Sequence, residues 1–178
     1  PGRRLSTERV VSQTLRQLYL SGVKRKGFPT VDQPRIVASI TGGGGQFFSD
    51  TLQEPGASSF LLEANVPYAK EALLKFIGDA RRVEADAPEV GFCSPEMAAL
   101  MADAARDRAL SLTMLLAQWS DCAGVGCTAT IVSHYTRRGG YRAHAAAAAG
   151  DGSITAYTHE LVKGARERAG DSAANSGE

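Results

Sequence analysis

The stretch Arg35 to Gly45, R-I-V-A-S-I-T-G-G-G-G, decides how the rest of the chain is interpreted. Residues 36–40 are apolar apart from Ser39 and rich in β-branched side chains, which predicts a buried strand. Glycines 42–45 end it, and a helical pattern follows. A strand, a glycine turn and a helix can bring backbone N–H groups to an anion, and Ser39 and Thr41 lie where α/β sheets place ligands. We interpret the turn as facing a ligand, against the alternative of a flexible connection, because so short a connection needs at most one or two glycines.

Composition predicts one globular domain over residues 1–178, with a core of about 6–169 and a polar tail at 170–178. The chain is 43% hydrophobic and carries a formal net charge of +1. That balance gives no electrostatic reason to expect nucleic acid or a membrane surface as a partner. No apolar run approaches the roughly 20 residues of a membrane-spanning helix.

The cysteines and histidines predict neither disulfides nor a metal site. The three cysteines, Cys93, Cys122 and Cys127, are an odd number and lack the spacing of zinc ligands. The histidines are scattered, and His144 is interpreted as a packed or surface residue rather than a ligand. Reduced thiols and the absence of a visible signal peptide predict the cytoplasm or an organelle, such as the mitochondrial matrix or plastid stroma, and not secretion. Pro1 is not an initiator methionine, so a processed terminus stays open.

The remaining pattern alternates helices and strands. Ser94-Pro95-Glu96 is a helix start with an N-cap, and Gly150-Asp151-Gly152 is a hairpin turn. We expect a three-layer α/β/α sandwich with a mixed, mostly parallel sheet of about five strands. The predicted elements are a helix over 6–22, a helix to about 53, a strand over 58–65, a helix over 69–77, a loop over 79–91, a helix over 94–112, a strand over 124–132, a hairpin of 141–148 with 154–160, and a helix from about 164. Residues 113–121 either continue the helix over 94–112 or form a loop.

The order of several short motifs resembles one family. They read A-S-I-T-G-G at 38–43, P-G-A-S-S at 55–59, P-Y-A-K-E-A-L at 67–73, S-P-E at 94–96, C-T-A at 127–129 and G-A-R at 164–166. The chain resembles the C-terminal domain of the competence/damage-inducible protein CinA, and within that family a divergent eukaryotic-type branch. The family's corresponding motifs are E-S-C-T-G-G, P-G-S-S, A-Y-S-N-E-A-K, S-x-E, V-T-G and G-D-R.

The resemblance implies hydrolysis of the carboxamide of nicotinamide mononucleotide, with release of ammonia and without a cofactor. It makes Ser39 the nucleophile and places Tyr68 across from it as a proton relay. Lys70 is a candidate base. The residues assigned to substrate binding are Thr41, Gly42, Gly43, Gly44, Thr128 and Arg166. The resemblance also implies a homo-oligomer.

Departures from the family pattern put the activity in question. The family's acid before the serine is Ala38, and its lysine after the tyrosine is Leu73. Because a serine without a base is a poor nucleophile, we expect impaired hydrolysis unless Lys70 or Lys75 substitutes. The alternative is a non-catalytic accessory subunit of a larger protein assembly. An active site predicts a cationic side chain close to Ser39, whereas an apolar wall would argue against catalysis.

Overall fold

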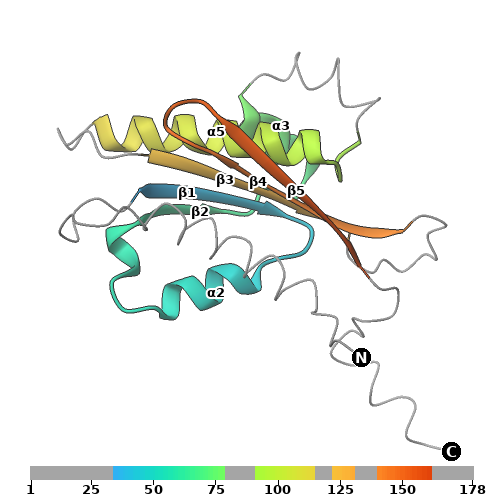
Figure 1. The fold of residues 1–178 in the computed structure, drawn as a ribbon, viewed down its shortest axis with the longest axis horizontal. Helices are drawn as coiled ribbons and strands as arrows, with labels where there is room; N and C mark the ends of the chain where they lie inside the picture. The colour runs from blue at the N-terminus through green and yellow to red at the C-terminus, as the bar shows by residue number, and fades with distance from the viewer. Residues whose placement is uncertain (1–33, 79–90, 115–121, 131–139, 162–178) are drawn as a thin grey trace, which may run out of the picture.

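The computed structural model describes residues 34–78, 91–114, 122–130 and 140–161 of the chain. They form an α/β fold with five strands and three α-helices (Figure 1). In chain order the elements are β1 (Arg35–Thr41), α2 (Gln46–Gln53), the 3-10 turn η1 (Ala57–Ser59), β2 (Leu61–Asn65), α3 (Lys70–Ile77), α5 (Pro95–Met114), β3 (Cys122–Ala129), β4 (Tyr141–Ala148) and β5 (Ile154–Leu161).

The five strands form one mixed sheet in the order β2-β1-β3-β4-β5. β1 is parallel to both β2 and β3, whereas β3 pairs with β4 and β4 with β5 in antiparallel fashion. The prediction of a mixed five-stranded sheet is confirmed. Parallel and antiparallel pairings are equal in number rather than mostly parallel, because β4 turns back beside β3 before the hairpin adds β5.

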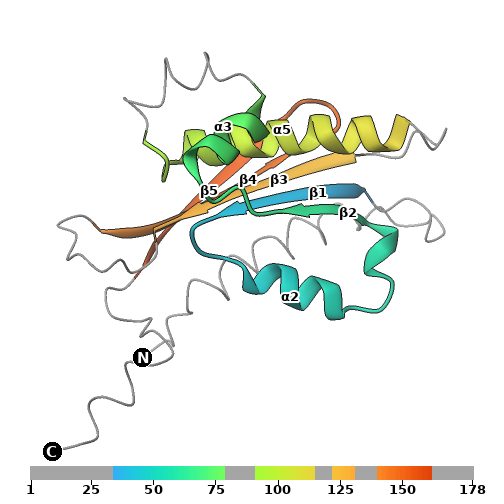
Figure 2. The same ribbon diagram turned by 180° about the vertical axis from the view of Figure 1, so that it is seen from behind.

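The helices lie on both faces of the sheet. α3 and α5 lie on one face and α2 on the other, as Figures 1 and 2 show from opposite sides. Side chains of β1 alternate between these faces, as the period of a strand requires. Ala38 and Ile40 join the core cluster that contains Phe47 of α2, whereas Val37 packs with Ala105 of α5. The sequence pattern of β1, apolar at 36–38 and at 40 with the small Ser39 between them, reflects burial on both faces.

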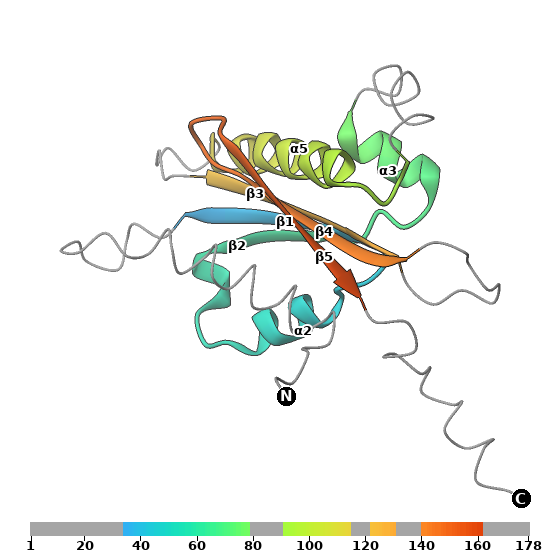
Figure 3. The same ribbon diagram turned by 45° about the vertical axis from the view of Figure 1, so that its right-hand side comes forward.

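α5 packs directly on the backbone of β3 (Figure 3). A Cβ atom at Gly126 would lie 2.5 Å from the backbone nitrogen of Ala102 and 2.8 Å from the Cβ of Met101, and closer still to the carbonyl oxygen of Ala98. Gly124 meets the backbone of the same helix one turn further on. The alternation of glycine in G-V-G, together with the alanines of α5, therefore allows the helix to approach the sheet without intervening side chains.

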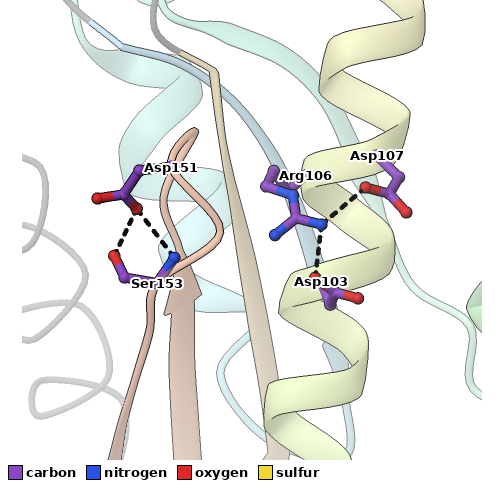
Figure 4. Close-up of polar contacts among 5 residues, drawn as sticks. All are labelled: Asp103, Arg106, Asp107, Asp151 and Ser153. Carbon is purple, nitrogen blue, oxygen red and sulfur yellow. Dashed lines mark hydrogen bonds and ion pairs between the residues drawn. The ribbon is translucent and has the colours of Figure 1, made fainter.

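Capping and turn residues fix the ends of two elements. The Ser94 hydroxyl accepts a hydrogen bond from the backbone N–H of Met97 at 3.0 Å, which confirms the predicted start of α5. In the β4–β5 turn, one carboxylate oxygen of Asp151 accepts hydrogen bonds from the N–H and hydroxyl of Ser153, at 2.9 and 2.6 Å (Figure 4). These bonds lower the pKa of Asp151.

On α5, Figure 4 also shows Arg106 paired with Asp103 and Asp107.

Several predicted boundaries differ from the structure. β2 begins at Leu61 rather than at 58, because residues 57–59 form a 3-10 turn. β3 begins at Cys122, two residues before the predicted start. α5 extends to Met114, which is consistent with the open alternative that the helix continues past residue 112. The helix predicted over 6–22, the loop over 79–90, the end of the strand predicted to 132, the helix from about 164 and the polar tail lie outside the described residues.

Candidate functional site

The candidate site lies at the carboxyl ends of the parallel strands β1, β2 and β3. In register, Ser39 of β1 lies between Asn65 of β2 and Gly126 of β3, and Thr41 lies beside Thr128. Residues in register on neighbouring strands point to the same face of a sheet. These side chains therefore share the face that α5 covers, and they converge where α/β sheets bind ligands.

The Ser39 hydroxyl is buried and has no hydrogen-bond partner among the residues that the structure describes. The residue is 0% exposed, and its Oγ is the buried side-chain oxygen that finds no hydrogen bond within the described part of the chain. An unsatisfied buried hydroxyl costs about 1–3 kcal/mol, so its presence at the carboxyl edge of the sheet calls for a functional explanation. The residue is also closed to water, so a ligand reaches the hydroxyl only if the side chains above it move.

The backbone of the glycine turn passes close to other atoms. At Gly42 these atoms are the backbone of Ala129 at the end of β3 rather than a ligand. Gly42 has φ +80°, and a Cβ there would lie 3.0 Å from the carbonyl carbon of Ala129 and closer to its oxygen. Gly44 also has a positive φ, of 107°, and both Gly43 and Gly44 are buried. Gly42 is thus explained by the end of β3, and the assignment of the turn to substrate binding stays a prediction.

The structure places the predicted catalytic partners of Ser39 at the surface. Tyr68 is 62% exposed, and Lys70 is exposed in the first turn of α3. Leu73, which the motif resemblance matches to the family's lysine, is buried in an apolar cluster with Met97 and Met101. The catalytic roles of Ser39, Tyr68 and Lys70 stay predictions.

Two threonine hydroxyls tie the end of β3 to the segment that leads into α5. The Thr128 hydroxyl donates to the carbonyl oxygen of Phe92 at 2.8 Å, and the Thr130 hydroxyl donates to Sγ of Cys93 at 3.1 Å. Thr128 therefore lines the site edge through a hydroxyl that already has an acceptor. Arg166, also predicted to bind substrate, lies outside the described residues.

Sequence reasoning missed a polar chain on the same face. Asn65 donates from Nδ2 to Oε1 of Glu63 at 2.8 Å, and Arg108 of α5 donates from Nε to the other oxygen of Glu63 at 3.0 Å. Asn65 is the neighbour of Ser39 in register. Glu63 and Asn65 are two residues apart in a strand, which places them on one face, but only the register shows that this face holds Ser39.

Comparison with known proteins identifies the fold. No family model matches the sequence, and no curated protein matches it significantly. Solved structures do match, at low identity. A CinA superfamily protein from Escherichia coli has a TM-score of 0.53 and 14% identity, covering 89% of this chain and 81% of that one. The chain has the CinA fold. One from Enterobacter cloacae has a TM-score of 0.53 and 12% identity, covering 91% and 83%, and one from Klebsiella pneumoniae has 0.52 and 13%, covering 89% and 84%.

A second polar row crosses the CinA-like sheet beside the site. Thr41, Thr128, His144 and Thr158 are consecutive neighbours in register on β1, β3, β4 and β5. Nδ1 of His144 lies 2.8 Å from the Thr158 hydroxyl. Burial is the main cause that lowers the pKa of His144; Arg142 lowers it further and Glu96 opposes both. His144 is therefore a neutral, packed histidine near pH 7, as its place in the alanine-rich strand predicted.

Metal and thiol chemistry find little support in the described part of this CinA-like fold. No three His, Cys, Asp or Glu residues there are grouped as metal ligands would be. Cys122 and Cys127 are buried, and Cys93 is half-buried. Burial raises the pKa of Cys127 to about 12, with a smaller contribution from Cys93.

None of the helices in the described ranges is long and apolar enough to cross a membrane.

Proposed function

We propose that the chain is a CinA-like nicotinamide-nucleotide domain that binds nicotinamide mononucleotide at the carboxyl ends of β1, β2 and β3 and hydrolyses its carboxamide at a strongly impaired rate. The observation that carries the proposal is the buried hydroxyl of Ser39 at this edge of the sheet, which finds no hydrogen-bond partner in the described ranges. A three-layer arrangement of the whole chain and a homo-oligomeric state belong to the same proposal, as does a cytoplasmic or organellar location.

The impairment follows from the positions of the residues predicted to assist Ser39. Amide hydrolysis through a serine requires a base that removes the hydroxyl proton while the oxygen attacks the amide carbon. Leu73 is 3% exposed within an apolar cluster and cannot act as a base. Lys70 is exposed at the start of α3 rather than buried on the face of the sheet. Slow turnover is therefore the expected chemistry.

A non-catalytic accessory subunit is the second candidate, and the apolar environment of Leu73 favours it. If the site has lost its ligand as well as its base, Ser39 is a small residue that α5 covers. The fold would then serve a larger protein complex. Size-exclusion chromatography with light scattering distinguishes a single chain, with a mass of 18.8 kDa, from a homo-oligomer and from a larger protein complex.

Binding and turnover are measured separately. A ligand at 100 times its dissociation constant stabilises the folded state by about 2.7 kcal/mol, which a thermal-shift titration with nicotinamide mononucleotide detects. We expect such a shift, together with ammonia release only slightly above that of Ser39→Ala. Turnover at about 1 s⁻¹ or faster, a rate typical of working enzymes, would contradict the impairment. If nicotinamide mononucleotide causes no thermal shift, the binding proposal is contradicted and the accessory role is favoured.

A further inference from the structure

We infer that Asn65 makes the proposed site select a carboxamide over a carboxylate, and that Glu63 and Arg108 hold the Asn65 amide in the orientation that does so. The inference rests on the proposed function, because it assigns the specificity of that same site. Asn65 would contact the ligand, whereas Glu63 and Arg108 act through Asn65 as positioning residues.

The sheet register places Asn65 next to Ser39. The two residues are paired neighbours at the ends of β2 and β1. Glu63, two residues earlier in β2, shares the face of Asn65, and its ion pair with Arg108 shows that this face is the one under α5. Asn65 is partly exposed, whereas Ser39 is closed to water. The proposed ligand would therefore contact the partly exposed Asn65 first and would reach the Ser39 hydroxyl only when the side chains above it move.

Glu63 decides which end of the Asn65 amide faces the site. Its two carboxylate oxygens each accept one hydrogen bond, one from Arg108 at 3.0 Å and one from Nδ2 of Asn65 at 2.8 Å. The reverse orientation would put Oδ1 of Asn65 against a carboxylate oxygen, with no proton between them. The amide orientation therefore follows from the chemistry of its neighbour. The carbonyl oxygen Oδ1 is turned away from Glu63, and no residue in the described ranges donates to it.

An outward-facing carbonyl oxygen favours a neutral ligand that can donate a hydrogen bond to it. The NH₂ group of a carboxamide can donate to Oδ1 of Asn65, and its carbonyl can accept from a hydroxyl. A carboxylate has no N–H, so its oxygens would meet Oδ1 as two acceptors in contact. A site that hydrogen-bonds a particular group rejects an analogue that leaves it unpaired. The geometry thus favours nicotinamide mononucleotide over nicotinic acid mononucleotide, the product of its hydrolysis.

The substitution Glu63→Gln tests the orientation with almost no change of shape. Its Oε1 can still accept from Arg108, which leaves Nε2 to donate to Oδ1 of Asn65. The Asn65 amide then turns over and presents Nδ2 to the ligand, which suits a carboxylate. Glu160→Gln is the matched control, because it removes an exposed carboxylate of β5, at the opposite edge of the sheet, that lies 3.6 Å from Arg142 of β4.

The measurement is the ratio of dissociation constants for nicotinamide mononucleotide and nicotinic acid mononucleotide, by calorimetry on the full chain. We expect the unsubstituted protein to prefer the carboxamide by about tenfold, the size of one hydrogen bond. Glu63→Gln should shift the ratio by about tenfold or more toward the carboxylate, and Asn65→Leu should bring it near one. Glu160→Gln should leave it unchanged. A structural role for Glu63 would weaken both ligands alike.

The outcomes separate the inference from the proposed function. If the unsubstituted protein binds neither nucleotide, the proposed function fails and the specificity of Asn65 fails with it. If it binds nicotinamide mononucleotide but the ratio is the same in Glu63→Gln and Glu160→Gln, only the inference is overturned. If Glu63→Gln does not fold, a ratio in Asn65→Leu that equals that of the unsubstituted protein overturns it.

Discussion

Substituting Gly126 by alanine tests whether α5 rests on the backbone of β3. The added Cβ would lie 2.5 Å from the backbone nitrogen of Ala102 and 2.8 Å from the Cβ of Met101. Ordinary non-bonded contacts are about 3.5 Å or longer, so the helix must move away from the sheet by about 1 Å. The atoms in the way include helix backbone, which cannot turn aside as the end of a flexible side chain can.

The expected loss of stability follows from that displacement. Overpacking a core costs typically about 1–3 kcal/mol, and backbone obstruction places Gly126→Ala near 3 kcal/mol. In a chain of this length each 1 kcal/mol lowers the melting temperature by about 2–4 °C, so a fall of about 6–12 °C is expected. Thermal unfolding followed by circular dichroism measures it, with urea denaturation as the equilibrium check.

Gly45→Ala is the matched control for this substitution. A Cβ at Gly45 meets nothing within 4 Å, and the residue has φ −58°, which alanine adopts without strain. Gly45→Ala should therefore leave the stability unchanged or raise it by a few tenths of a kcal/mol through the unfolded state. If Gly126→Ala and Gly45→Ala have the same melting temperature, α5 does not pack on the bare backbone of β3, and the reasoning is refuted.

Three further outcomes are expected. Leu73→Ala should lower the free energy of unfolding by about 2–5 kcal/mol in urea, whereas Leu52→Ala, at a side chain 66% exposed, should change it little. The lowered pKa of His144 means that the unfolded chain binds its proton more readily, so stability should fall as the pH drops below about 6.5, and urea midpoints should show a smaller fall in His144→Gln. Cys127, with a pKa near 12, should resist iodoacetamide at pH 8 until urea unfolds the chain, whereas the half-buried Cys93 should label sooner by mass spectrometry.

Local patterns in the sequence predicted most of the described elements. The apolar run before the glycines is β1, the Ser94 cap starts α5, and the Asp151 turn joins β4 to β5. Each of these signals depends on residues close together in the chain. The order of strands does not, and so β4 was expected in a mostly parallel sheet but lies antiparallel to β3.

The candidate site could be predicted only in part. Ser39 and Thr41 were expected where the first strand runs out, and they lie in the last three residues of β1, because the glycines mark that end in the sequence. Thr128 was assigned by resemblance within a strand predicted over 124–132, and only the structure places it near the end of β3. Asn65 was taken as the last residue of a strand and nothing more. Its relation to Ser39 depends on the register of β1 with β2, and the orientation of its amide depends on Arg108, a residue 43 positions away.

The closed position of Ser39 also governs which charges can form there. In water, a relative permittivity of about 80 weakens the field of an ion, but in a protein interior the effective value is about 4–20. An alkoxide at Ser39 would have no water around it, and no described residue donates a hydrogen bond to its oxygen. The electrostatic environment therefore keeps the proton on the hydroxyl. The position suits recognition of a neutral group better than it suits an anion that forms and disappears in each catalytic cycle.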